Sequence, residues 1–138
     1  MHQVRRLSLN PKGATVSETN PSGLSDNAAS AIAYVTFVPA IVFLVMPPYN
    51  ASPNVRFHSW QSIFLNIAAI VVCIALSIVF AVVWAILPFG FYAIGHLIWL
   101  LIDLGFFILW LVCILRALNG VRFKLPIIGA LAEKQAGV

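Results

Sequence analysis

The run IFLNIAAIVVCIALSIVFAVVWAIL occupies residues 63–87 and carries no charged side chain. At about 1.5 Å per residue, a helix of this length reaches about 37 Å, which exceeds the roughly 30 Å of hydrocarbon in a bilayer. A second run, HLIWLLIDLGFFILWLVCILRAL, follows at residues 96–118. The link from Pro88 to Gly95 is too short for anything except a tight turn. The two runs are therefore predicted to form an antiparallel hairpin of membrane-spanning helices.

Residues 28–46 form another apolar run that contains no charge. Ser25 and Asp26 precede it, and both residue types cap helix N-termini. Pro39 lies in the middle of the run, where it would remove a backbone hydrogen bond. This predicts a kinked spanning helix or, as the alternative, a re-entrant hairpin. We expect the spanning helix, which brings the predicted number of transmembrane helices to three.

The composition also indicates a membrane protein. Hydrophobic residues make up 62% of the 138 residues and charged residues 9%, whereas a soluble domain has about 45–50% and about 25%. A chain this short cannot bury so much apolar surface, so the excess must face lipid. The net charge of +4 does not indicate nucleic acid, because the Lys and Arg residues are scattered and form no basic face. The predicted fold class is an all-α membrane protein.

The sequence outside the spans divides into two further segments. Residues 1–27 are polar and rich in Ser, Asn, Pro and Gly, which predicts a disordered tail. Asn119 and Gly120 are predicted to end the last helix of the transmembrane domain, residues 28–118. Residues 119–138 mix cations with apolar side chains, so we expect an amphipathic tail at the membrane interface.

Cations close to the predicted spans set the expected orientation. Arg56, Arg116, Arg122 and Lys124 lie on the side of the first loop and the C-terminus, whereas the second loop has no charge. The positive-inside rule therefore places the first loop and the C-terminus in the cytoplasm and the N-terminus outside. Arg116, Arg122 and Lys124 are also candidate contacts for lipid phosphate.

Asp103 is the only carboxylate within a predicted span. Charging it near the bilayer centre would cost about 2.5–3.5 kcal/mol, so it should be neutral, paired or directed at a polar interior. His96 lies on the same helix face, and Ser77 of the preceding helix lies at a similar depth. These three residues form a candidate intramembrane polar site for a proton or substrate path. The favoured alternative is that Asp103 only joins the helices by a hydrogen bond.

A second polar face lies at the cytoplasmic mouth of the helix that follows the first loop. Its members are Arg56, His58, Gln61, Ser62 and Asn66. They could line a groove into the helix bundle. The favoured alternative is that Arg56 binds lipid phosphate while the others cap the helix and satisfy its free amides.

The sequence contains no pattern typical of an enzyme. It has no Gly-rich phosphate loop, no nucleophile beside a base, no paired carboxylates and no Cys-x-x-Cys, so neither catalysis nor a cofactor is expected. His58 and His96 lie at opposite interfaces, which argues against a metal site. Cys73 and Cys113 fall inside apolar runs and are expected to be inert thiols. The expected partners are membrane lipids and other membrane proteins or a second copy of the chain, without nucleic acid.

Three segments resemble a known family: GLSDNAASAIAY from Gly23, VRFHSWQS from Val55 and NGVRFKLPIIG from Asn119. They are similar to a bacterial family of unknown function that is related to the twenty-kilodalton Tic subunit of the chloroplast import translocon. The resemblance implies a bacterial inner (plasma) membrane and a non-enzymatic, translocon-like or scaffolding role. The alternatives are a small oligomeric transporter or channel that uses Asp103 and the polar face from Arg56 to Asn66, and an accessory subunit of a membrane enzyme.

Overall fold

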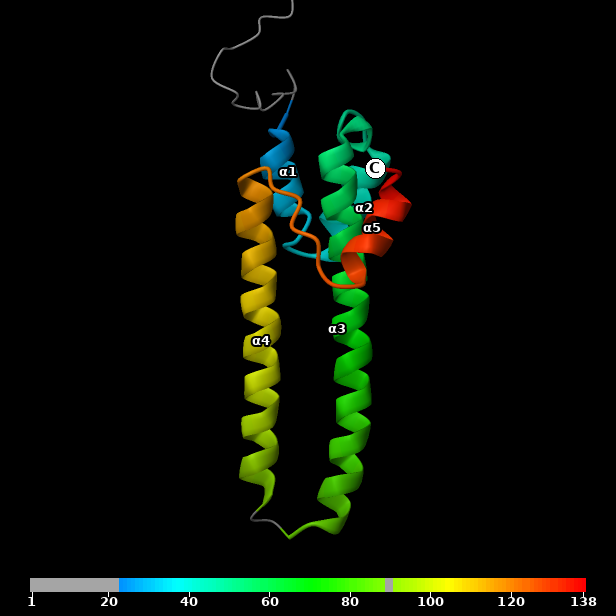
Figure 1. Cartoon of the computed structure of the whole chain (residues 1–138). Helices are drawn as coiled ribbons and strands as arrows, with labels where there is room; N and C mark the ends of the chain where they lie inside the picture. The colour runs from blue at the N-terminus through cyan, green and yellow to red at the C-terminus, as the bar shows by residue number, and fades with distance from the viewer. Residues whose placement is uncertain (1–22, 89–90) are drawn as a thin grey trace, which may run out of the picture.

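The computed structural model describes residues 23–88 and 91–138, and this part of the chain is helical without strands. Its elements are α1 (Asp26–Ile32), α2 (Phe37–Val45), the 3-10 turn η1 (Tyr49–Ala51), α3 (Pro53–Ile86), α4 (Tyr92–Leu118) and α5 (Ile128–Ala136). α3 and α4 run side by side along the length of the molecule, and the short elements gather around one end (Figure 1). We call residues 23–65 and 113–138 the head and residues 66–112 the hairpin.

The hairpin consists of the two expected antiparallel helices. Both α3 and α4 are long and apolar enough to cross a membrane. In the most apolar 18-residue stretch of each helix, only 0% (α3) and 6% (α4) of the residues are buried inside the chain. Core helices of soluble proteins bury such residues, so these two helices need an apolar solvent around them.

α3 begins ten residues before the predicted start of its apolar run, at Pro53. Ser52 caps it, because its side chain accepts a hydrogen bond from the backbone N–H of Val55. Pro53 occupies the first helical position, where a missing N–H has no cost. At about 1.5 Å per residue, the 34 residues of α3 reach about 51 Å, so the helix extends about 20 Å beyond the hydrocarbon into the head.

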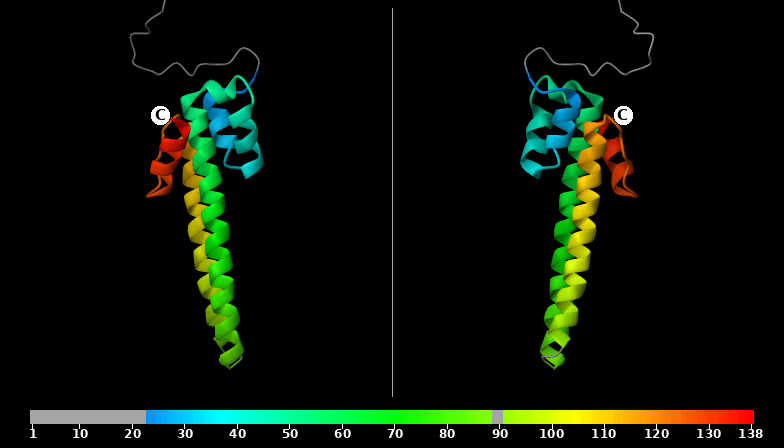
Figure 2. Two further views of the ribbon diagram at one scale, coloured as in Figure 1. Left: turned by 90° about the vertical axis from the view of Figure 1, so that its right-hand side faces the viewer. Right: turned by 90° about the vertical axis from the view of Figure 1, so that its left-hand side faces the viewer.

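Residues 28–46 do not form one helix, so the expected first span is corrected here. α1 ends at Ile32 and α2 starts at Phe37. The two pieces, of 7 and 9 residues, reach about 10 and about 14 Å, far less than the hydrocarbon thickness. The chain reverses between them, so both lie beside the head end of α3 (Figures 1 and 2). A helical hairpin, the alternative from the sequence, thus replaces the spanning helix.

Pro39 does not cause this break. It is the third residue of α2, where the backbone N–H has no intrahelical partner in any case. The chain leaves the helical path at residues 33–36, and Thr36 is extended with φ −149° and ψ 172°. The turn is held by tertiary contacts, since the carbonyl oxygens of Ala33 and Tyr34 accept hydrogen bonds from side chains of α3 and α4.

The end of α4 confirms the predicted stop signal. Asn119 is its C-cap, and Gly120 takes φ +70°, a left-handed conformation that favours glycine. The chain then crosses the head to α5, which packs on α3 (Figure 1). This contact buries Phe57 against Ala132 and Ala136.

The two predicted tails have different outcomes. Residues 1–22 of the expected disordered tail lie outside the described residues, while Asp26 and Asn27 belong to α1. The expected interfacial segment, residues 119–138, supplies an extended stretch and α5. Both ends of the described chain lie at the head end of the hairpin (Figure 1). The predicted placement of the N- and C-termini on opposite membrane faces depended on a third crossing, and it loses that support.

Candidate functional site

Tyr34, at the tip of the turn between α1 and α2, is the centre of a buried polar cluster. Its side chain is 1% exposed. Its hydroxyl accepts a hydrogen bond from Gln61 Nε2 at 3.0 Å and lies 3.1 Å from His58 Nδ1. Gln61 Nε2 also donates to the carbonyl oxygen of Phe123 at 2.9 Å. The cluster therefore joins the α1–α2 turn, α3 and the segment that follows α4.

Two further side chains satisfy the carbonyl groups at this turn. Ser62 Oγ donates to the Ala33 oxygen at 2.6 Å, and Trp110 Nε1 donates to the Tyr34 oxygen at 2.6 Å. The last carbonyls of a helix lack intrahelical partners. Near lipid, such non-helical backbone is tolerated only where protein groups satisfy it. Ser62 and Trp110 thus let the chain reverse beside the membrane surface.

Three buried polar side-chain atoms of α3, two of them in the cluster, have no hydrogen-bond partner among the described residues: His58 Nε2, Ser59 Oγ and Gln61 Oε1. Their side chains are between 0% and 1% exposed. An unpaired buried polar group costs about 1–3 kcal/mol, so such groups are uncommon in folded proteins. Their presence here makes this cluster the strongest candidate in the head for more than a packing role.

The cluster is uncharged near neutral pH. Burial lowers the pKa of His58 to about 4, and the nearby positive charge of Arg122 lowers it further. Burial raises the pKa of Tyr34 well above its usual range. The Tyr34 hydroxyl has one proton to donate, and of its two recorded partners only Nδ1 of the neutral His58 can accept it, since Gln61 Nε2 is a donor. The proton of His58 is then on Nε2, which is the unpaired atom.

The predicted polar face of α3 is brought together in part. His58, Gln61 and Ser62 share the buried cluster, while Arg56 is half-exposed at the edge of the head. Asn66 lies one turn further along, and its side chain donates to the Ser62 carbonyl of the same helix. The favoured interpretation was that His58, Gln61 and Ser62 cap their own helix, and the structure shows that they do not. They bind other segments instead.

Tyr34 and Trp110 are not among the candidate residues predicted from the sequence. Both lie in apolar runs, where an aromatic side chain is typical of packing or lipid contact. The available signal was the polar tip of each ring, because a buried tyrosine hydroxyl or indole N–H needs a partner. The polar residues of α3 could supply such partners.

The candidate intramembrane residues are not linked to one another in the structure. Ser77 donates its hydroxyl to the Cys73 carbonyl of its own helix at 2.7 Å. The ring of His96 packs on Trp84, with 5.5 Å between centroids. Asp103 is exposed, and within residues 23–88 and 91–138 it makes no hydrogen bond or ion pair.

Asp103 nevertheless flanks the side of α4 that approaches α3. Residues three and four apart share a helix face, so Asp103 shares one with Trp99, Phe106 and Phe107. The ring of Trp99 lies 6.0 Å from that of Phe80 on α3. Phe106 and Phe107 line a groove together with residues of α3. The carboxyl therefore lies between two places where the helices approach each other.

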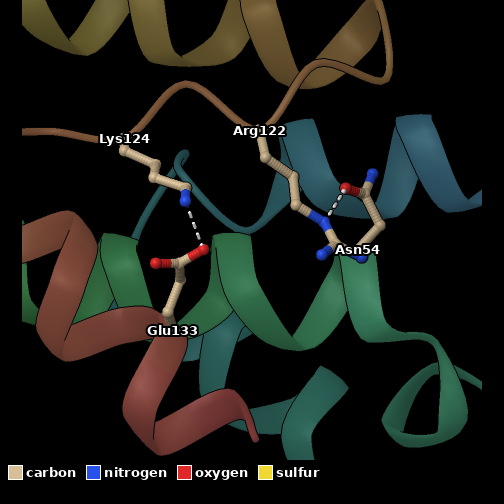
Figure 3. Close-up of polar contacts among 4 residues, drawn as sticks. All are labelled: Asn54, Arg122, Lys124 and Glu133. Carbon is tan, nitrogen blue, oxygen red and sulfur yellow. Dashed lines mark hydrogen bonds and ion pairs between the residues drawn. The ribbon is translucent and has the colours of Figure 1, made fainter. Parts of the chain in front are cut away.

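The predicted lipid-phosphate contacts gather at the head end. Arg122 Nε donates to Asn54 Oδ1 at 3.2 Å, and Lys124 Nζ lies 2.6 Å from Glu133 Oε1 (Figure 3). Arg116 is exposed in the last turn of α4. Two of the three cations therefore help to fix the extended segment onto α3 and α5, and all three stay accessible to an anionic surface.

Two archaeal proteins align with most of the chain. A UPF0132 membrane protein of Methanocaldococcus jannaschii is 35% identical over 113 residues, which are 81% of this chain and 89% of that protein. A UPF0132 membrane protein of Archaeoglobus fulgidus is 36% identical over 115 residues, which are 83% of this chain and 98% of that protein. No family model and no solved structure matches the chain.

These relatives correct the resemblance drawn from the three short segments. The matching proteins are archaeal UPF0132 proteins and not bacterial Tic-related ones. The bacterial inner membrane and the translocon-like role rested on that resemblance, and both lose their support with it. The relatives are membrane proteins, in agreement with the two long apolar helices. The chain belongs to the UPF0132 family of membrane proteins.

Proposed function

We propose that this protein is a non-enzymatic membrane scaffold, which holds a folded head at one membrane face and assembles with other transmembrane helices through its hairpin. The main support for this proposal is the exposure of the hairpin, because the most apolar stretches of α3 and α4 have 0% and 6% of their residues buried. Helix association in membranes depends on packing and interhelical hydrogen bonds. Asp103 offers such a bonding group on a largely apolar surface.

The chemistry of the head agrees with a structural task. The hydroxyls of Tyr34 and Ser62 hold the α1–α2 turn, and the neutral His58 ring accepts from Tyr34. A nucleophile needs an adjacent free base, and Nδ1 of His58, the nitrogen that could act as one, is already engaged with the Tyr34 hydroxyl. The head is therefore suited to present a rigid surface.

The cations support a cytoplasmic head. Arg56, Arg116, Arg122 and Lys124 all lie in the head, and residues 87–92 at the opposite turn carry no charge. The positive-inside rule then places the head, and with it both ends of the described chain, in the cytoplasm. Each cation near an anionic surface adds about 1 kcal/mol to membrane binding.

In-membrane photo-crosslinking tests the scaffold directly. A photoreactive amino acid replaces Ile74 of α3 or Ile108 of α4, which are 56% and 52% exposed. Leu131 of α5, 47% exposed in the head, is the matched control. We expect the two hairpin positions to capture one recurrent, identified membrane protein, either another protein or a second copy. Adducts with lipid alone at both hairpin positions would overturn the proposal.

A small oligomeric transporter or channel is the second candidate. The observation in its favour is the position of the exposed Asp103 at mid-span, beside residues of α4 that approach α3. Two helices enclose no pathway, so several copies would have to surround one. Ion flux in proteoliposomes that is lost in Asp103→Asn would favour this function over the scaffold.

A further inference from the structure

The cations nearest to the hairpin indicate that the membrane surface lies level with Gln61 of α3. Lys124 follows Phe123, whose carbonyl oxygen accepts a hydrogen bond from Gln61 Nε2. The Arg116 guanidinium lies 5.9 Å from the centre of the Phe123 ring. Cations next to a membrane lie at the depth of the lipid phosphates, and residues 62–115 contain no Lys or Arg. The part of the molecule beyond Gln61 is therefore at the depth of the acyl chains.

The turn between α1 and α2 extends beyond this level. Phe37 and Ile41 of α2 line a groove together with Ile67 and Ile70 of α3. Ile70 comes nine residues after Gln61, which is about 13 Å further along the helix. The beginning of α2 thus lies beside the part of α3 that is suited to lipid.

We call residues 33–38, at this turn, the first tip. Its large apolar side chains face outward, because Val35, Phe37 and Val38 are 60%, 50% and 53% exposed. The two carbonyl oxygens at the reversal accept hydrogen bonds from side chains of α3 and α4. Non-helical backbone inside a bilayer needs such partners from the protein. The first tip therefore combines an apolar surface with a satisfied backbone.

Residues 126–128, on the opposite side of the hairpin, form what we call the second tip (Figure 2). Ile127 takes φ 65° and ψ −59°, and the N–H of Ile128 donates to the Pro126 carbonyl oxygen at 2.7 Å. This is a γ-turn with positive φ, a strained conformation that β-branched residues rarely adopt. Ile127 is also 81% exposed, the largest fraction among the large hydrophobic side chains that the structure describes.

An isoleucine at position 127 makes physical sense only in an apolar environment. Its neighbour Ile128 packs against the cluster that contains Leu65, which lies four residues beyond Gln61 and about 6 Å further along α3. Glycine would adopt the same backbone conformation without strain. Because Ile127 packs little on its own chain, only transfer of its side chain from water into lipid offsets that strain.

We propose that both tips are inserted among the acyl chains of the leaflet on the head side, so that the head is partly immersed in the membrane. In Figure 2 the two tips are the ends of the head that lie nearest to the turn of the hairpin. The partner is a lipid leaflet, and its apolar interior is what the tips recognise. Insertions on both sides of the hairpin hold the head at a fixed depth. The inference goes beyond the scaffold function, because it requires no protein partner.

Spin labels on the full chain, in nanodiscs of phosphatidylcholine and phosphatidylglycerol, measure the depth of each tip. The background carries Cys73→Ala and Cys113→Ala. One label is attached at Val38→Cys in the first tip and another at Ile127→Cys in the second. Collisions of each label with oxygen, which dissolves among acyl chains, are compared with collisions with a polar nickel chelate, which does not enter them.

Each tip has a control position at the other end of its helix. Val45→Cys lies seven residues after Val38 on the same face of α2, and Val45 is 70% exposed. Val138→Cys follows α5, and Val138 is 40% exposed. We expect an oxygen-to-nickel collision ratio at least about fivefold higher at each tip than at its control, since hydrocarbon excludes the chelate. Nickel access at either tip equal to that of its control would overturn the inference. Low access of both reagents would also overturn it, because a protein segment would then cover the tip.

A measurement on the unsubstituted chain excludes an effect of the labels themselves. Phosphatidylcholine with a diazirine in the middle of one acyl chain forms adducts with its neighbours on illumination. We expect adducts at residues 35–41 and at Ile127, and at least about tenfold fewer at residues 45–55, which lie outside the hydrocarbon. A labelled hairpin without adducts at the two tips would contradict the inference. The capture of a membrane protein by the hairpin is independent of either result, so the scaffold function is tested separately.

Discussion

The head and the hairpin share one helix, α3, in two opposite environments. In the head, α3 buries Phe57, His58 and Gln61 to between 0% and 1% exposure. In the hairpin, the same helix leaves Ile70 and Ile78 at 56% and 61%. The head end of α3 is thus packed like a protein interior, with several polar side chains hydrogen-bonded to other segments, and the remainder is suited to lipid. α3 is therefore one continuous helix, of which only the part in the hairpin is suited to cross a membrane.

Truncation of a large core side chain should separate the two regions most strongly. Phe57→Ala should destabilise the head by about 3–5 kcal/mol, since it opens a cavity under α5. Ile78→Ala is the control on the exposed part of α3 and should change the stability of the head by less than about 0.5 kcal/mol. Denaturant unfolding in detergent micelles gives both values. Equal losses from the two variants would contradict the division into a packed head and a lipid-facing hairpin.

Acidification should weaken the head and not the hairpin. The pKa of His58 is about 4 in the folded head, and its value in an unfolded chain is about 6.5. Below about pH 6.5 His58 binds a proton in the unfolded chain but stays neutral in the folded head. The free energy of unfolding of the head therefore falls by up to about 3 kcal/mol as the pH approaches 4. Above about pH 7 this contribution is constant. Melting temperatures between pH 7.5 and 4.5 measure it, and His58→Gln should remove most of the slope.

A single hydroxyl can be removed from each region, and the effects on stability compared. Tyr34→Phe leaves His58 without its donor and should cost the head about 1–3 kcal/mol. Ser77→Ala removes a hydroxyl that bonds only to its own helix, and we expect a change below about 0.5 kcal/mol. Hydrogen exchange at residues 33–36 should quicken in the first variant alone. Equal exchange in both variants would show that the buried cluster does not hold the turn.

The surface ion pair should have the smallest effect. Lys124 and Glu133 lie 2.6 Å apart, with Lys124 56% exposed. Exposed pairs contribute about 0–1 kcal/mol and are screened by salt. Lys124→Met should therefore lower the stability of the head by less than about 1 kcal/mol in low salt and by still less in 1 M salt. A loss comparable to that of Tyr34→Phe would mean that α5 depends on this contact.

The sequence was sufficient for the hairpin and insufficient for the head. The apolar runs of α3 and α4 can be recognised in the sequence, because a bilayer requires a spanning helix to have a minimum length and an apolar composition. The run at residues 28–46 has the same apolar character, and its reversal depends on Ser62 and Trp110, which lie 29 and 76 residues from the atoms they bind. The local sequence pattern of residues 28–46 does not indicate hydrogen bonds to residues so far along the chain. For the same reason His58, Gln61 and Ser62 were grouped correctly, while their partner Tyr34 was missed.

The overhang of the head has a mechanical consequence for the surrounding bilayer. α2 lies against the part of α3 that contains Ile63 and Ile70, and it keeps Phe37 and Ile41 exposed at 50% and 47%. These apolar side chains suit the acyl chains of the leaflet next to the head, while the opposite leaflet meets only two helices (Figure 2). The protein is therefore tapered, and we expect it to gather where the membrane bulges toward the head side.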